Sequence, residues 1–208
     1  MLDARSTDVA GSRLASGASE HLDAILRAAS MSLFSHLDAF WPTRPDWDVH
    51  EANLVAHLHG AALARGHRAY TEAPIQVPDT KRIDLLVLTT EPLALWLEAK
   101  RIYAPRQGKD VLSDIRRLID RGSRLGDVLP NRLPGTPTAA AFIAVTHRTE
   151  FAAWWNQPVG CPPRFEGEEW SEIGVLIGQA SARLTYSHGA GRPRPSYVLA
   201  ALWPRGQS

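Results

Sequence analysis

The chain is poor in cysteine and in long apolar segments. Cys161 is the one cysteine among 208 residues, so an intramolecular disulfide and a cysteine-based zinc cluster are both excluded. No segment approaches the roughly 20 apolar residues of a membrane-spanning helix, and the N-terminus lacks the basic and then apolar pattern of a secretory signal. We therefore expect a cytoplasmic protein without membrane contact, in a reducing compartment that suits a lone cysteine.

The sequence also lacks a strong charge of either sign. With 23 Lys and Arg against 22 Asp and Glu, the formal net charge is +1, so any nucleic-acid-binding surface has to be local. Apolar residues make up 44% and charged residues 22%, which indicates a globular chain rather than a disordered one. The motifs of zinc hydrolases, serine hydrolases and P-loop ATPases are missing from the sequence.

The organisation of the chain is read from its apolar periodicity. Ser, Gly, Ala and Asp dominate residues 1–18, which we predict to form a loose tail. Apolar residues at helical spacing predict a helix over residues 21–40. Residues 19–208 are expected to form one domain, with a core at about 48–146 and a C-terminal extension at 147–208. The order of predicted elements favours an α/β or α+β fold, in which helices flank a mixed central sheet and an N-terminal helix precedes them.

Two strands are the clearest predicted elements of the chain. Residues 82–89 and 93–100 are apolar runs joined by a short connection, which predicts an antiparallel hairpin. Because side chains alternate along a strand, Glu98 and Lys100 share one face and lie roughly 7 Å apart along it. Asp84, at the start of the first strand, is then expected to lie close to both across the ladder.

Asp84, Glu98 and Lys100 combine charges that are costly to place together. Two carboxylates at one sheet edge repel each other unless a positive charge lies between them. Mg²⁺ suits this position, because it binds oxygen ligands and is usually held by one or two carboxylates with water and substrate phosphate. Lys100 could orient the attacking water or neutralise developing charge. The structural alternative is that the three residues are merely the solvated ends of two strands.

The quoted residues resemble the motif of the PD-(D/E)xK nuclease superfamily, which has a restriction-endonuclease-like fold. The resemblance rests on the segments Arg82–Val87 and Trp96–Lys100 and on the predicted element order over residues 48–146. Ile83 stands where the signature has proline. The resemblance implies a metal-dependent nuclease that hydrolyses phosphodiester bonds, more often in DNA than in RNA.

The resemblance also implies roles for individual residues. It implies that Asp84, Glu98 and the backbone carbonyl of Ala99 bind Mg²⁺ or Mn²⁺ and that Lys100 assists the attacking water. Family members often add a glutamate from the first core helix, and Glu51 is the matching residue here. A competing interpretation pairs Glu51 with Asp48 in a helix capping box, which is a structural role alone.

A basic segment follows the motif. Between Lys100 and Arg124, eight Lys or Arg oppose three Asp, a local balance of 8 − 3 = +5. Such a surface would favour contact with a phosphate backbone, and an ordinary solvated helix face is the alternative. The predicted nucleic-acid-binding residues are Arg101, Arg106, Lys109, Arg116 and Arg117.

Three functional hypotheses remain open from the sequence, the third being a different metal-dependent hydrolase that uses the same residues on a small phosphate ester. The first is a Mg²⁺-dependent or Mn²⁺-dependent nuclease acting on nucleic acid, with a homodimer or a partner protein supplying the targeting. The second is a catalytically inactive protein that keeps the nuclease fold as a nucleic-acid-binding or assembly module. Trp154, Trp155 and Trp170 could stack on bases, but we favour packing in the core.

Overall fold

A computed structural model describes most of the chain. The described residues are 5–40, 50–74, 82–122, 136–157, 167–189 and 195–205. Cys161 and Asp48 lie outside these ranges. Among the helices of the described residues, none combines the length and apolar character needed to cross a membrane.

The described residues form six helical elements and six strands. The helical elements are α1 (Arg5–Phe40), α2 (Glu51–Ala64), the 3₁₀ turn η1 (Pro105–Gln107), α3 (Gly108–Gly122), α5 (Thr149–Trp155) and α6 (Glu168–Gly178). The strands are β1 (Arg68–Pro74), β2 (Arg82–Leu88), β3 (Ala94–Arg101), β4 (Thr138–Thr146), β5 (Ala182–His188) and β6 (Ser196–Arg205). The predicted mixed α/β architecture is therefore confirmed, with the hairpin strands β2 and β3 within two residues of their predicted ends.

The described strands form one six-stranded mixed sheet in the order β1-β2-β3-β4-β6-β5. The β3–β4 pair is parallel, and every other neighbouring pair is antiparallel. Strand β6 pairs with β4 along its length, so the predicted C-terminal extension completes the same sheet as the predicted core. Strand β3 lies inside the sheet and is hydrogen-bonded on both sides, which fixes the residues that it carries.

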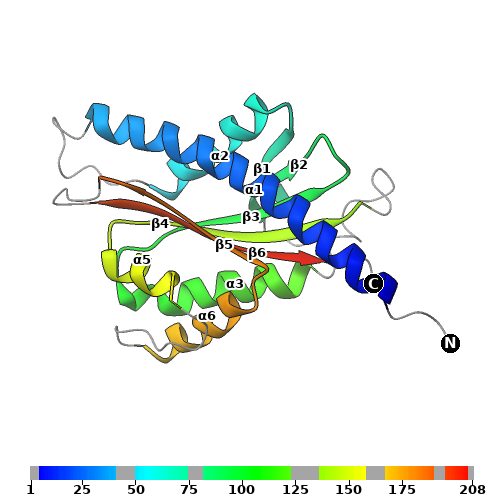
Figure 1. Ribbon diagram of the computed structural model, residues 1–208. Helices are drawn as coiled ribbons and strands as arrows, with labels where there is room; N and C mark the ends of the chain where they lie inside the picture. The colour runs from blue at the N-terminus through cyan, green and yellow to red at the C-terminus, as the bar shows by residue number, and fades with distance from the viewer. Residues whose placement is uncertain are drawn as a thin grey trace.

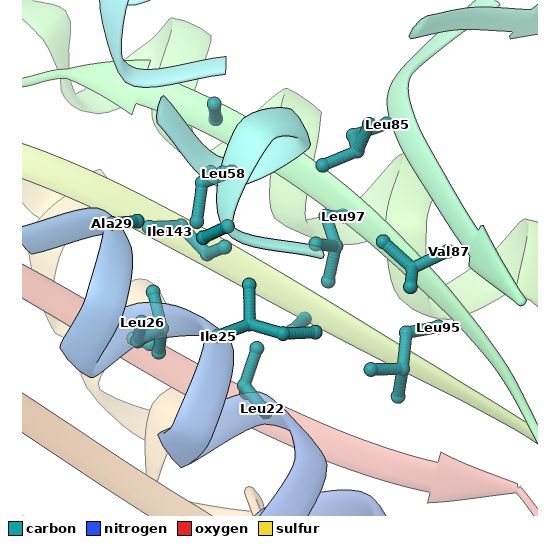
Figure 2. Packing of buried hydrophobic residues seen from close by; sticks show 14 of the residues in the cluster. Leu22, Ile25, Leu26, Ala29, Leu58, Leu85, Val87, Leu95, Leu97 and Ile143 are labelled. Atoms are coloured by element: carbon teal, nitrogen blue, oxygen red, sulfur yellow. The ribbon is translucent and has the colours of Figure 1, made fainter. Parts of the chain in front are cut away.

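Helices cover both faces of the sheet, as Figure 1 shows: α1 and α2 lie on one face, and α3, α5 and α6 lie on the other. On the first face, Leu22, Ile25 and Leu26 of α1 pack against strand residues that include Leu95 and Leu97 (Figure 2). These side chains are almost completely withdrawn from solvent. Their burial is the main stabilising contribution on this face.

Tryptophans dominate the opposite face of the sheet. Trp154, Trp155 and Trp170 are all buried in the apolar cluster between the sheet and its helices, which confirms the predicted core role. The Trp170 indole Nε1 donates a hydrogen bond to the Pro105 carbonyl at 2.7 Å. The indole also lies so close to Gly108 that an added Cβ there would stand 2.8 Å from Nε1. Helix α6 therefore supports the start of α3 and the turn before it.

One local prediction was wrong. Helix α1 begins at Arg5 rather than near residue 21, so residues 5–18 of the predicted tail are helical. Ala18 is completely buried against the core, which gives the helix a reason to extend beyond its Leu-rich part. Residues 171–186, whose sequence pattern is ambiguous between helix and strand, contain most of α6 and most of β5.

Candidate active site

The β2–β3 hairpin brings the two predicted acidic residues together. The recorded ladder ends at the pair Leu85 and Leu97, and Asp84 and Glu98 are the next residues of the two strands. The Ala99 N–H donates a hydrogen bond to Asp84 Oδ2 at 2.7 Å, which ties the Asp84 carboxylate to β3. The charge of Asp84 also contributes to the raised pKa of Glu98, so the two carboxylates lie near each other.

Helix α3 supplies two further charged residues to this group. Lys100 Nζ lies 2.7 Å from Asp114 Oδ2, and Arg117 Nη2 lies 3.1 Å from Asp114 Oδ1. Arg117 also donates to Glu98 Oε1. The face that carries Glu98 and Lys100 is therefore the one covered by α3. The resulting chain of contacts, Glu98–Arg117–Asp114–Lys100, holds both catalytic candidates on β3 in fixed positions.

Asp114 was not predicted as a site residue, and Arg117 was predicted only as a nucleic-acid contact. Asp114 is only 8% exposed, and it lies three residues after Val111 and four before Leu118. These spacings put an acid in the middle of the apolar stripe of α3. A carboxylate in such a stripe is costly unless it is paired. A charged residue among the apolar positions of α3 could therefore have indicated, from the sequence alone, that Asp114 has a buried basic partner.

Burial changes the proton affinity of the two acids. Burial raises the pKa of Glu98 to about 8, with the nearby Asp84 charge acting in the same direction and Arg117 opposing it. Burial also raises the pKa of Asp84, and the Ala99 N–H partly offsets this rise while the Glu51 charge adds to it. Two crowded carboxylates with raised pKa values favour an added cation or protons between them.

The charged form of Lys100 is favoured, whereas the charged forms of the two acids are disfavoured. Burial alone would lower the pKa of Lys100, but the hydrogen bond and charge of Asp114 outweigh it, so the pKa is raised. Glu51 and Glu98 act in the same direction as Asp114. Lys100 is therefore a stable ammonium group. It can stabilise negative charge or orient a water molecule, but it is a poor proton acceptor at neutral pH.

Glu51 reaches the site from the other side of the sheet. It is the first residue of α2, and His50 is the N-cap residue without a side-chain cap hydrogen bond. The alternative capping box depends on Asp48, which lies outside the described residues, and the structure has Glu51 at the first helical position rather than the third. Instead, Glu51 Oε2 accepts a hydrogen bond from the Arg101 N–H at 3.3 Å. This contact places Glu51 beside the end of β3.

The predicted nucleic-acid-binding residues divide into two groups. Arg116 binds Glu172 of α6, with Nε 2.8 Å from Oε1, and Arg117 points into the acidic group. These two arginines have structural partners within the chain. Arg101, Arg106 and Lys109 lie around the loop after β3 and at the start of α3, with Arg106 and Lys109 exposed. This second group stays the predicted contact surface.

The donor set fits a hard divalent cation held by few protein ligands. Within the described part of the chain, no group of three or more His, Cys, Asp and Glu residues is arranged to hold a metal ion. Asp84 offers a half-buried carboxylate and Glu98 a buried one, and one or two carboxylates with water and substrate phosphate are usual for Mg²⁺. The Ala99 carbonyl stays a predicted third ligand.

Comparison with known proteins gives no relatives. No protein-family model, curated protein or solved structure matches this chain.

Proposed function

We propose that the chain is a divalent-metal-dependent nuclease of the PD-(D/E)xK type that hydrolyses phosphodiester bonds, with DNA as the substrate. The observation that carries this proposal is the contact at the end of the β2–β3 hairpin, where Asp84 Oδ2 accepts the N–H of Ala99, the residue between Glu98 and Lys100. The restriction-endonuclease-like fold belongs to the same proposal. It is supported by the meander β1-β2-β3 and by the parallel pairing of β4 with β3 across α3.

Each residue of the group has a definite task in this proposal. Asp84 and Glu98 would hold Mg²⁺ or Mn²⁺, which supplies charge for the scissile phosphate and a more acidic water. Lys100 orients the attacking water and stabilises negative charge that develops on the phosphate. Asp114 positions the Lys100 ammonium group, and its 2.7 Å contact keeps that group charged.

Arg117 acts as a positioning residue for Glu98. Its guanidinium contacts both Glu98 and Asp114, so it lies between two acids from different elements. A planar guanidinium with several N–H donors suits this bridging position better than an ammonium group. Without an added cation, this contact lowers the cost of keeping the Glu98 carboxylate buried.

One observation favours a second candidate function. Three acids of the group already have partners. Asp84 accepts the Ala99 N–H, and Glu98 contacts the Arg117 guanidinium. Asp114 contacts both Lys100 and Arg117. A self-neutralised ion-pair network can be purely structural. The alternative is therefore an inactive nuclease-fold protein that binds nucleic acid without cutting it.

The full chain tests the two candidates directly. Supercoiled, linear duplex and single-stranded DNA and single-stranded RNA are each incubated with the protein in Mg²⁺, Mn²⁺ or EDTA. The nuclease predicts cleavage of DNA with either metal and none in EDTA. Binding of all substrates without cleavage under any metal condition would identify the inactive alternative, and cleavage of RNA alone would overturn the choice of DNA.

The binding of metal is expected to depend on pH. Because the raised pKa of Glu98, about 8, leaves it largely protonated at neutral pH, metal binding must displace a proton. The affinity for Mn²⁺ should therefore rise about tenfold per pH unit from pH 6 to 8 and level off above. Calorimetry in buffers of different ionisation enthalpy measures both the affinity and the released proton. An affinity that is constant from pH 6 to 9 would contradict this assignment.

A further inference from the structure

The loop that follows β3 presents an exposed aromatic side chain to solvent. Tyr103 is 44% exposed, although it lies only three residues after Lys100. The guanidinium carbon of Arg101 stands 5.0 Å from the centroid of the Tyr103 ring, and that of Arg106 stands 5.9 Å from it. Both distances suit cation–π contact. The loop thus combines an accessible aromatic ring with two positive charges beside the candidate active site.

The backbone beneath this ring is held from several directions. Gln107 Oε1 accepts hydrogen bonds from the Tyr103 N–H at 2.7 Å and the Ala104 N–H at 3.1 Å, and Gln107 Nε2 donates to the Arg101 carbonyl at 2.8 Å. Arg148 Nε donates to the Tyr103 carbonyl at 3.1 Å. None of these bonds uses the Tyr103 side chain. The backbone that carries the ring is therefore held in place by contacts that do not involve the ring.

We infer that Tyr103, flanked by Arg101 and Arg106, is a stacking subsite for an unpaired nucleotide near the scissile phosphate. This inference rests on the proposed nuclease function and specifies its substrate as single-stranded or frayed nucleic acid. Inside a duplex both faces of each base are covered by its neighbours, so only an unpaired base can offer a free face to the ring. The two guanidinium groups suit the adjoining phosphates.

The position of the ring agrees with this use. Three residues of extended chain span at most about 10 Å, so Tyr103 lies within reach of a nucleotide close to a phosphate at Lys100. Glu51 also fixes the start of the loop, through its hydrogen bond from the Arg101 N–H. The stacking subsite and the acidic group are therefore rigidly connected through the end of β3.

Binding without cleavage tests the subsite. Fluorescence anisotropy in EDTA measures the affinity for labelled 20-nucleotide single strands of DNA and RNA of mixed sequence and for the blunt DNA duplex of the same sequence. Tyr103→Ala should weaken single-strand binding about 5- to 150-fold and change duplex binding less than about twofold. Tyr103→Phe should keep single-strand binding within about twofold. Tyr70→Ala, at a tyrosine 49% exposed on β1, is the matched control and should leave both affinities unchanged.

The outcomes separate this inference from the proposed function. Unchanged single-strand affinity in Tyr103→Ala, an equal loss for single strand and duplex, or no binding by the wild-type protein overturns the stacking subsite. If single-strand binding depends on Tyr103 but no metal supports cleavage, the subsite stands and the nuclease proposal fails. If cleavage occurs but single-strand binding does not depend on Tyr103, the nuclease proposal stands and the stacking subsite fails. DNA and RNA strands that bind alike support recognition of the base face, and dependence on Tyr103 for one of them alone restricts the subsite to that strand.

Discussion

Replacement of Asp84 by Asn, or of Lys100 by Met, is expected to reduce metal-dependent cleavage by about 10²- to 10⁴-fold. Asp84→Asn keeps an oxygen that can accept the Ala99 N–H but removes the charge that would bind a metal ion. Lys100→Met keeps the length of the side chain but removes the ammonium group, and Asp114 retains Arg117 as a partner. Both variants should therefore fold while losing the chemistry.

The matched control for this pair is Asp110→Asn. Asp110 is an exposed acid in the first turn of α3, one turn before Asp114 on the same helix. Initial rates on supercoiled DNA in Mg²⁺ are compared at equal protein concentration, with unfolding midpoints measured in parallel. Cleavage by Asp84→Asn or Lys100→Met at the rate of Asp110→Asn would assign the activity to other residues.

Replacement of Trp170 by Ala is expected to lower the free energy of unfolding by about 3–5 kcal/mol. The side chain is completely buried, with its ring 5.0 Å from that of Phe151 and 5.8 Å from that of Trp154, measured between centroids. The substitution leaves a cavity and also removes the hydrogen bond to the Pro105 carbonyl. A loss of this size is a large part of the stability of an ordinary domain.

Urea unfolding followed by circular dichroism measures this loss. Val175→Ala is the control, because Val175 lies on the same helix and is 54% exposed, and it should change the stability by less than about 0.5 kcal/mol. A loss below about 1 kcal/mol in Trp170→Ala would mean that α6 does not support the start of α3 as described.

The hairpin was predictable from the sequence because its information is local. The short connection between β2 and β3 determines which residues pair, and side chains alternate between the two faces along each strand. This local information is enough to predict that Asp84 and Glu98 lie near each other. The partners of the site were not predictable in the same way. Arg117 was interpreted as a surface residue, because its contact with Glu98 depends on how α3 crosses the sheet.

Two other differences have different physical causes. The composition of residues 5–18 favours a loop, but propagation of α1 from its packed part outweighs this weak local preference. Residues 171–186 gave no clear period because a helix and a strand meet there, with Gln179 as the C-cap of α6. The pairing of β6 with β4 joins distant parts of the chain, and hydrophobic patterning carries no information about such a partner.

The site is built from both layers that cover the sheet. Glu51 comes from α2 on one face, whereas Asp114 and Arg117 come from α3 on the other, and β3 lies between them. Neither layer alone can assemble the full set of charges. During refolding from denaturant, catalytic competence should therefore return only with the slower of the two docking steps, so the recovery of cleavage would serve as a kinetic marker for completion of the whole tertiary structure.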